Sequence, residues 1–376
     1  MQSFRRNSMK RTLIDLIPTY ITKLRPYVPG KPVEEIEREL KVKAIKLASN
    51  ENPLGPSPKA VNAIMQFLPL ANRYPDGSGY YLREKLAARL GVSMDEIILG
   101  AGSTELIELV ARTFVAREDE VLTSDGSFAM YYIAAQEVGA QLVRVPLKNS
   151  AYDLEAISGG IGERTKAIFL ANPNNPTGTM FTATEFDRFF QRVPEHVVVV
   201  LDEAYFDYVQ RADYSRSLGY VREGRNLLVL RTFSKAHGLA GLRIGYGIGR
   251  PELLGYLNRI RSPFNTSAIA QAAALAALDD GDHIRRSVES NNRGLKFLGD
   301  GLTRMGVKFV PSVTNFVLVD VGCDGDEVFE LLKRKGVIVR PMAFMGFPTA
   351  IRVTVGTQEE NEIFLKAFEK VRSTFV

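Results

Sequence analysis

Lys235 lies in the most informative stretch of the chain, a glycine-rich run from Arg231 to Arg243 with the sequence RTFSKAHGLAGLR. Ser234 precedes the lysine directly, and Arg243 follows it by eight positions. Lysine forms a Schiff base with a carbonyl compound when burial lowers the pKa of its ammonium group, and serine and arginine bind phosphate. These side chains therefore suit a cofactor that carries both a carbonyl group and a phosphate. A solvated lysine and arginine on a glycine-rich connection is the alternative, and three further segments decide between the two.

The segment 100–105, with the sequence GAGSTE, joins a short apolar run to a helical pattern that continues to residue 115. The free backbone N–H groups of a helix N-terminus attract anions, and small residues let a phosphate approach closely. Ser103 or Thr104 would cap the helix or donate a hydrogen bond to such an anion. A glycine-rich turn with a purely structural role remains the alternative, because such turns are common between strands and helices.

Asn175 belongs to the segment 172–178, with the sequence NPNNPTG, which follows another apolar run at 167–170. A rigid loop at the end of a strand would hold the Asn175 amide as a preorganised donor toward a ring oxygen. The prolines and asparagines equally suit a loop whose only task is rigidity.

Asp202 opens the sequence DEAY, directly after the fully apolar run 197–201. A carboxylate at the end of a central strand is costly unless it meets a cation, such as a protonated pyridine nitrogen. Tyr205 would add a hydroxyl hydrogen bond to the same ring system, whereas a helix cap or turn is the alternative role for Asp202. Phe128 offers an aromatic face for stacking on a flat cofactor, although a core phenylalanine is the simpler explanation.

Short apolar runs alternate with helical patterns between about residues 95 and 250, and this alternation is typical of βαβ units. The run 197–201 is apolar at every position, which indicates a strand covered on both faces of a mainly parallel sheet. The apolar runs lie at 97–99, 120–123, 167–170, 197–201 and 227–230. The sequence thus predicts an α/β fold with helices flanking the sheet, and functional residues at the carboxyl ends of its strands.

A second domain is expected after residue 261, where the pattern changes to long helices at 268–278 and 284–302 and ends in a helix at 358–372. The strands expected in this part are 307–310, 315–319, 337–339 and 351–355. Such a mixture indicates a smaller α+β domain. We divide the chain into an N-terminal tail and arm at 1–45, a large cofactor-binding domain at 46–262 and a small C-terminal α+β domain at 263–376. The proline-containing arm is expected to pack on the small domain.

The composition is that of an ordinary soluble globular protein, with 376 residues of which 45% are hydrophobic and 24% charged. The 48 basic and 43 acidic side chains give a net charge of +5 without a long basic block, so we expect anionic small molecules and no nucleic acid as partners. The single cysteine, Cys323, excludes an intramolecular disulfide, and the three scattered histidines suggest no metal site. No apolar stretch approaches the ~20 residues that span a bilayer, and we expect a cytoplasmic protein with no membrane association.

Taken in their order along the chain, these motifs resemble the fold-type-I aminotransferases that depend on pyridoxal phosphate. The likeness extends over nearly the whole chain. The segments 46–57 (KLASNENPLGPS), 73–77 (RYPDG) and 339–342 (VRPM) are similar to histidinol-phosphate aminotransferases in particular.

The resemblance implies a role for each motif. Lys235 would bind pyridoxal phosphate covalently, and Asp202 would pair with its pyridine nitrogen. The ring hydroxyl would be bonded by Asn175 and Tyr205, and the ring would stack beneath Phe128. The residues expected at the cofactor phosphate are Ser103, Thr104, Ser234 and Arg243, together with Tyr74 from the partner subunit of a homodimer. Lys235, Asp202 and Tyr205 would be the catalytic residues.

The resemblance also implies an activity, which is transamination between histidinol phosphate or imidazole acetol phosphate and glutamate or 2-oxoglutarate in L-histidine biosynthesis. Arg352 would take the substrate carboxylate, and Arg340 with Tyr27 would contact the substrate phosphate. Asn52 is also expected to contribute to substrate binding. Forked guanidinium donors suit both anions better than lysine does. An aromatic amino-acid aminotransferase and a threonine-phosphate decarboxylase remain alternatives with the same cofactor.

The sequence departs from the usual pattern of the family in three places. Gly126 stands where a proline commonly precedes the stacking aromatic residue, His237 replaces an aromatic or small residue, and 344–345 (FM) changes the loop before Arg352. These departures affect the substrate assignment more than the chemistry. A non-catalytic nucleotide-binding protein is a rival from another class, but the segment 100–105 lacks the third glycine of a dinucleotide fingerprint and no Walker lysine follows it.

Overall fold

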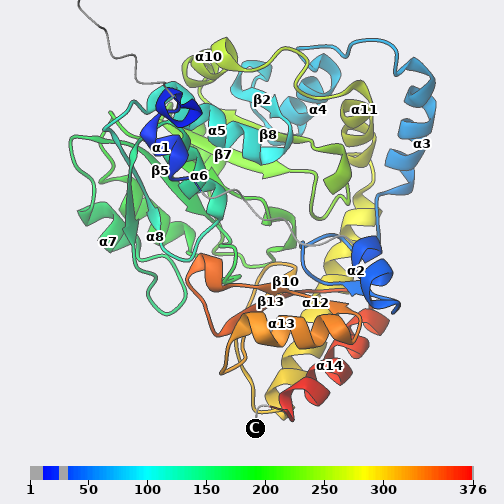
Figure 1. Ribbon diagram of the computed structural model, residues 1–376. Helices are drawn as coiled ribbons and strands as arrows, with labels where there is room; N and C mark the ends of the chain where they lie inside the picture. Colours follow the sequence, from blue (N-terminus) through cyan, green and yellow to red (C-terminus); the bar gives the residue numbers. More distant parts are fainter. Residues whose placement is uncertain (1–11, 25–32, 375–376) are drawn as a thin grey trace, which may run out of the picture.

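The computed structural model describes residues 12–24 and 33–374. Its larger part is built on a seven-stranded sheet, and the C-terminal strands and helices, orange and red in Figure 1, form a smaller part beside it. In spatial order the strands of the large sheet are β2 (Ile97–Gly100), β8 (Gly245–Gly249), β7 (Leu227–Thr232), β6 (Val198–Asp202), β5 (Thr165–Ala171), β3 (Glu120–Ser124) and β4 (Gln141–Val145).

The large sheet is mainly parallel and is flanked by helices, so the α/β fold predicted from the sequence is confirmed. Strands β7, β6, β5, β3 and β4 run parallel to one another, whereas β8 is antiparallel to both β7 and β2. Every residue of the central strand β6 is buried, as a strand with helices over both faces requires. The carboxyl ends of the parallel strands consequently meet at one edge of the sheet.

Two strands of the large sheet, β4 and β8, are missing from those expected from the sequence. Strand β8 has the sequence GYGIG, and its glycines hide the apolar pattern of a buried strand. They are required by close packing, because a Cβ atom at Gly247 would lie 3.0 Å from side-chain carbons of both Ile98 and Leu228. Strand β4 lies at the edge of the sheet and is only partly buried, so its hydrophobic pattern is weak.

The smaller part contains a four-stranded antiparallel sheet in the order β12 (Arg340–Pro341), β13 (Ala350–Thr354), β10 (Phe316–Asp320) and β9 (Lys308–Val310). Three of the expected strands correspond to β9, β10 and β13. The fourth, 337–339, becomes β11 (Val337–Ile338), which pairs in parallel with β1 (Ile45–Lys46) outside the sheet. The expected helix at 358–372 is α14 (Gln358–Arg372).

The remaining α-helices surround the two sheets (Figure 1). Their bounds are α1 (Thr19–Thr22), α2 (Val33–Leu40), α3 (Pro58–Phe67), α4 (Tyr80–Leu90), α5 (Gly102–Phe114), α6 (Ala129–Glu137), α7 (Leu154–Gly159), α8 (Ala183–Phe190), α9 (Ser217–Arg222), α10 (Pro251–Ile260), α11 (Ala268–Ala277), α12 (Gly281–Arg304) and α13 (Gly325–Arg334). Short 3-10 helices are η1 (Leu13–Leu16), η2 (Leu68–Leu70), η3 (Met94–Glu96), η4 (Phe206–Tyr208), η5 (Ala240–Leu242) and η6 (Ala343–Met345).

The packing changes from one core to the other along α12. Helix α11 packs on α3 and α4, and its alanines join the core of the large sheet. Val288 of α12 packs with Tyr205, whereas Leu298 and Leu302 join the core of the small sheet. The predicted division between residues 262 and 263 stays a prediction, and so does the packing of the N-terminal arm. The parts of the arm that the structure describes pack on two different regions. Helix α1 lies beside α6, and Ile36 of α2 packs against Ile338.

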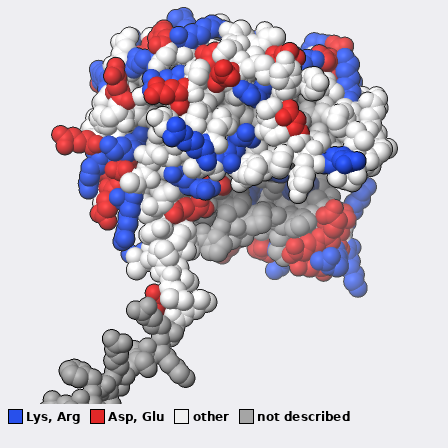
Figure 2. Space-filling model, turned by 90° about the horizontal axis from the view of Figure 1, so that it is seen from above, with Lys and Arg blue, Asp and Glu red and all other residues white. Residues whose placement is uncertain are grey.

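The molecular surface mixes charges of both signs. On the face shown in Figure 2, basic and acidic side chains are interspersed and do not gather into one basic block. Within residues 12–24 and 33–374, no helix combines the length and the apolar character needed to cross a membrane.

Helix α12 packs closely against Val355, the residue that directly follows β13. This contact generates a stability prediction. A Cβ atom at Gly294 would lie 2.2 Å from Val355 Cγ1, so we expect Gly294→Ala to lower the free energy of unfolding by about 1–3 kcal/mol. Gly255→Ala is the matched control, because Gly255 lies on the exposed face of α10 and a Cβ atom there would have no neighbouring atom within 4 Å.

The control substitution should raise the free energy of unfolding by about 0.5–1 kcal/mol, since alanine favours a helix interior over glycine. Urea denaturation of the two variants measures both values. Equal effects at the two positions would refute the close contact.

Candidate active site

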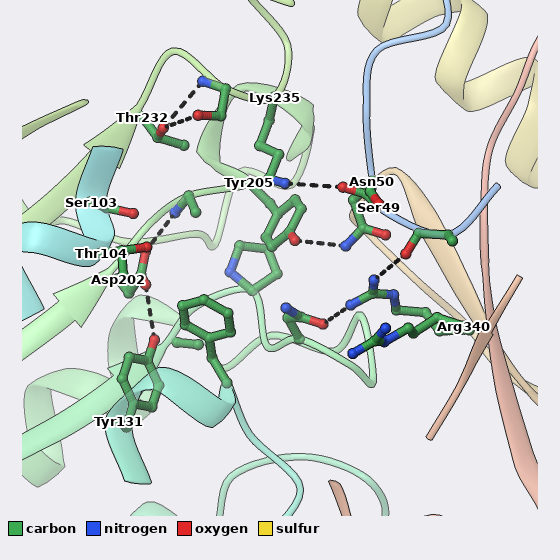
Figure 3. A pocket seen from close by; sticks show the side chains of 18 of the residues that line it. Ser49, Asn50, Ser103, Thr104, Tyr131, Asp202, Tyr205, Thr232, Lys235 and Arg340 are labelled. Carbon is green, nitrogen blue, oxygen red and sulfur yellow. Dashed lines mark hydrogen bonds between the residues drawn. The ribbon is translucent and has the colours of Figure 1, made fainter. Parts of the chain in front are cut away.

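A cavity of about 230 Å³ opens at the carboxyl ends of the parallel strands, between the large sheet and the small one. Side chains from both sheets and from the segment 48–50 converge on it (Figure 3). The lining residues are Ala48, Ser49, Asn50, Ser103, Thr104, Phe128, Tyr131, Ala171, Pro173, Asn175, Asp202, Ala204, Tyr205, Thr232, Ser234, Lys235, Arg243, Arg340 and Arg352. One cavity therefore contains an amine, a carboxylate and three guanidinium groups.

Lys235 follows β7 and is partly buried at the wall of the cavity. Burial lowers the pKa of Lys235 to about 8, and the positive charge of Arg352 adds to this effect. Its Nζ donates to the backbone carbonyl of Ser49 at 3.5 Å and lies 5.6 Å from the centre of the Tyr205 ring. A substantial fraction of this amine is neutral, and therefore nucleophilic, near physiological pH.

Asp202 is the last residue of β6 and is almost completely buried. Burial raises the pKa of its carboxyl group to about 6, although hydrogen bonds to the carboxylate oppose this shift. The bonds come from the Tyr131 hydroxyl at 3.0 Å and from the backbone N–H of Ala204 at 3.1 Å. At neutral pH the group is thus an anion in a poorly hydrated place, where a cationic ligand atom would stabilise it.

Ser103 and Thr104 lie in the first turn of α5, beside the guanidinium of Arg243. A Cβ atom at Gly102 would lie 2.4 Å from Arg243 Nη2, so only glycine lets the guanidinium reach this helix terminus. Arg243 Nη1 also donates to Ser234 Oγ at 3.4 Å. Free amides of a helix N-terminus, hydroxyls and a guanidinium are the donor set that binds phosphate. These residues therefore fit the phosphate of the expected cofactor.

Arg340 and Arg352 are direct cross-strand partners on β12 and β13. Like charges directly opposite one another destabilise a sheet, so this pair indicates a site for anions. Arg352 Nη1 donates to Asn175 Oδ1 at 2.5 Å, and its Nη2 donates to the carbonyl of Ala48 at 2.7 Å. The Arg340 guanidinium lies 4.8 Å from the centre of the Phe344 ring. The cavity is thus cationic at this end as well as at α5.

Most of the site residues expected from the sequence line this cavity, and of those that the structure describes, Asn52 and Tyr74 do not. Asn52 is buried behind it, where its Nδ2 donates to the carbonyl of Ala236 and to Ser287 Oγ. Tyr74 is 83% exposed and stacks on Phe264, away from the cavity of its own chain. Tyr27 lies outside the described residues.

Several lining residues were not expected from the sequence, notably Asn50, Tyr131 and Thr232. Thr232 Oγ1 donates to Ser234 Oγ at 3.0 Å and accepts from the Ser234 backbone N–H. A signal for Tyr131 exists in the sequence, because it follows Phe128, the residue that directly precedes α6, by three positions and so lies on the same side of the helix. Asn50 and Thr232 owe their places to tertiary contacts that no local pattern displays.

The departures at Gly126 and His237 have structural explanations. Gly126 has a left-handed backbone (φ 61°), and a Cβ atom there would lie 2.7 Å from the Phe347 ring. His237 is buried against Phe233, with a ring-centre distance of 4.9 Å, and burial lowers the pKa of its imidazole. Neither residue lines the cavity.

The chain belongs to the aminotransferase class I and II family, whose sequence model matches residues 42–368. Curated relatives carry a more specific name. The chain is 48% identical to the histidinol-phosphate aminotransferase of Moorella thermoacetica over 353 residues, covering 93% of this chain and 92% of the relative. It is 50% identical to the enzyme of that name from Anaeromyxobacter sp. over 359 residues, covering 95% and 99% of the two chains.

A solved structure is similar over the same extent. The histidinol-phosphate aminotransferase of Sinorhizobium meliloti in complex with pyridoxal-5'-phosphate superimposes with a TM-score of 0.89 at 30% identity, covering 98% of this chain and all of the other (100%). The family resemblance inferred from the motifs is thereby confirmed.

The lowered pKa of Lys235 generates a pH prediction for the protein without cofactor. Only the neutral amine reacts with acetic anhydride, so the labelling rate of Lys235 should rise with pH through a midpoint of about 8. Because Arg352 disfavours the charged amine, Arg352→Gln should move this midpoint upward. Mass spectrometry of the peptide that contains Lys235 measures the rate.

Arg334→Gln is the control for the charge effect, since Arg334 is exposed on α13 and does not line the cavity. It should leave the midpoint unchanged. A midpoint near the ordinary lysine value of about 10.4 in the unsubstituted protein would contradict a desolvated amine.

Proposed function

We propose that the chain transfers an amino group between histidinol phosphate and 2-oxoglutarate, with imidazole acetol phosphate and glutamate as the other pair, using pyridoxal phosphate. This is a step of L-histidine biosynthesis. The observation that carries the proposal is the presence of Lys235 and the buried carboxylate of Asp202 in one cavity with cationic groups at both ends. The names of the relatives support the choice of substrates.

The cofactor would be held by residues of the large sheet. Ser103, Ser234 and Arg243 would bind its phosphate, and Phe128 would cover its ring. Asp202 would face the ring nitrogen, where its negative charge favours the protonated form of that atom. When bound, the cofactor supplies an aldehyde that captures amines and a cationic ring that accepts electron density.

Lys235 would move the proton. A general base works best when its pKa lies near the operating pH, and a value of about 8 gives Lys235 Nζ both a neutral fraction and sufficient basicity. In this role Nζ would take the proton from Cα of the amino donor and pass it to the cofactor, and in the reverse half-reaction it would give a proton to Cα of the amino acceptor. The carbonyl of Ser49 and the ring of Tyr205 bound the space in which the amine moves.

The substrate anions would be bound by the cross-strand arginines. Arg352 takes the carboxylate of glutamate, and Arg340 takes the phosphate of histidinol phosphate. Both groups accept paired hydrogen bonds from a planar guanidinium. An aromatic amino-acid aminotransferase and a threonine-phosphate decarboxylase are both less well supported, because the relatives named above are histidinol-phosphate aminotransferases. Against an aromatic amino-acid aminotransferase, an aromatic ring also needs no second guanidinium.

A cytoplasmic homodimer is part of the proposal. Tyr74 and Phe264 are 83% and 46% exposed, and together they form a stacked aromatic pair on the surface. Met65, Leu68 and Leu70 are more than half exposed nearby in the sequence. Exposed apolar side chains of this size are typical of an interaction surface. We propose that a second copy covers this surface and that Tyr74 reaches the cofactor phosphate of that copy.

A comparison of substrates tests the function. Glutamate-dependent conversion of imidazole acetol phosphate should be far faster than conversion of phenylpyruvate, and no carbon dioxide should be released. Lys235→Ala should lower kcat at least about a thousandfold, because it removes both the covalent attachment and the base. Lys296→Ala, on the exposed face of α12, should retain activity. Undiminished turnover by Lys235→Ala with bound cofactor would eliminate the proposed chemistry.

Mixed dimers test the placement of Tyr74. Chains with Lys235→Ala and chains with Tyr74→Phe should each have low activity when alone. In a mixed dimer the Tyr74→Phe chain keeps its lysine and receives an intact tyrosine from the partner, so one site of the two should work. Activity assays after mixing, unfolding and refolding measure the recovery. No recovery, in a mixture that sedimentation shows to be dimeric, would place Tyr74 outside the partner's site.

A further inference from the structure

A chain of buried hydrogen bonds runs from the small sheet to Tyr205 in the wall of the cavity. Figure 3 shows its last bond, between Asn50 and Tyr205. Asn50 lies at the centre of these bonds, with 1% of its surface exposed. Asn50 Nδ2 donates to the Tyr205 hydroxyl oxygen at 2.8 Å. On the other side, Thr354 Oγ1 accepts from the Asn50 backbone N–H at 2.9 Å and donates to Asn50 Oδ1 at 3.1 Å. The three residues connect segments that are 304 and 155 positions apart in the sequence.

The direction of these bonds is fixed by the threonine. Thr354 Oγ1 accepts the backbone N–H of Asn50 and donates its own proton to Asn50 Oδ1. The amide oxygen of Asn50 is thereby committed to Thr354, and the amide nitrogen faces Tyr205. The Tyr205 oxygen therefore accepts a hydrogen bond from Asn50. The O–H of Tyr205 is not directed at Asn50 and acts as a donor to another group. Donation to that oxygen also makes the phenol a stronger donor.

Thr354 lies on the strand that carries the substrate arginine. Arg352 and Thr354 are two residues apart on β13, so their side chains point to the same face of the sheet. The neighbouring segment accepts further bonds, from Arg352 Nη2 to the carbonyl of Ala48 at 2.7 Å and from Lys235 Nζ to that of Ser49 at 3.5 Å. One short segment is thus bonded to the lysine, to the tyrosine and to the strand of the arginine.

We propose that Asn50 and Thr354 are positioning residues that make Tyr205 a hydrogen-bond donor to the ring hydroxyl of the cofactor and tie this donor to the strand of Arg352. The inference rests on the proposed function, since it assigns the partner of Tyr205. The bond from Tyr205 stabilises negative charge on the ring oxygen. If this bond is weaker, the negative charge is less stabilised. The bound cofactor then keeps the proton that controls its visible absorbance up to a higher pH.

Titration of the visible absorbance band of the substrate-free holoenzyme tests the proposal. Thr354→Val, which removes the hydroxyl at nearly constant volume, should raise the pH midpoint of the band by about 0.5–1 unit, the equivalent of one neutral hydrogen bond. Thr354→Ser should restore the midpoint. Asn50→Asp is a second variant that replaces the donor by an acceptor, and it should also raise the midpoint.

A double substitution separates this role from a structural one. In a Tyr205→Phe background, Thr354→Val should leave the midpoint where Tyr205→Phe alone puts it. The reason is that the hydrogen-bond relay from Thr354 through Asn50 to Tyr205 acts only through the lost hydroxyl. Thr165→Val is the matched control, since Thr165 is a buried strand threonine that also accepts a backbone N–H, from Gly162 at 2.9 Å, but lies at the opposite end of β5 from the cavity. It should change the unfolding midpoint without moving the absorbance midpoint.

Two results would overturn the relay while the proposed function stands. One is an absorbance midpoint that both Thr354→Val and Asn50→Asp leave unchanged in an enzyme that transaminates normally. The other is an equal shift in the Tyr205 and Tyr205→Phe backgrounds. If the unsubstituted protein develops no visible band with pyridoxal phosphate, the proposed function fails and the relay fails with it.

Discussion

The cavity depends on one constraint, which is that an amine and a carboxylate are held away from bulk water. Burial lowers the pKa of Lys235 to about 8 and raises that of Asp202 to about 6, so the surroundings disfavour both charges. Guanidinium groups stand at both ends, with Arg243 near α5 and Arg340 with Arg352 on the small sheet. Positive groups outnumber negative ones among the lining residues. Such a cavity selects ligands that are anionic at both ends and cationic beside Asp202.

The two sheets contribute different charged groups to the cavity. The parallel sheet places Asp202 and Lys235 at the ends of neighbouring strands, where backbone geometry fixes their spacing. The antiparallel sheet brings the two arginines face to face, and a bound anion would reduce the repulsion between them. Phe316 joins the parts, because its ring contacts Tyr205 edge-on at 5.2 Å and lies at the same distance, 5.2 Å, beneath the Arg352 guanidinium. The position of Arg352 is therefore tied through Phe316 to Tyr205, on the side of the cavity that the large sheet forms.

Much of this arrangement could be predicted from the sequence, since the residues that end apolar strands are recognisable by pattern. Asp202 at the end of β6 and Lys235 shortly after β7 are of this kind. The two asparagines of the sequence NEN show where pattern fails. Alternation along a strand would put Asn50 and Asn52 on one face, and we expected Asn52 at the substrate. The left-handed backbone of Asn50 (φ 54°) turns the chain, so Asn50 faces Tyr205 while Asn52 bonds the carbonyl of Ala236. No local signal reports that turn or the distant partner Thr354.

Glu203 directly follows Asp202, but its carboxylate is paired with Arg231 and adds little negative charge to the cavity. Successive side chains of an extended segment point to opposite sides, and the side chain of Glu203 is fully buried (0% exposed) without lining the cavity. An unpaired carboxylate there would be costly and would raise the pKa of Asp202 further. Arg231 binds it through Nε at 3.0 Å and Nη2 at 2.8 Å, while the guanidinium packs on the Phe206 ring at 3.6 Å. This pairing largely cancels the second negative charge, so the carboxylate that a ligand meets at the end of β6 is that of Asp202.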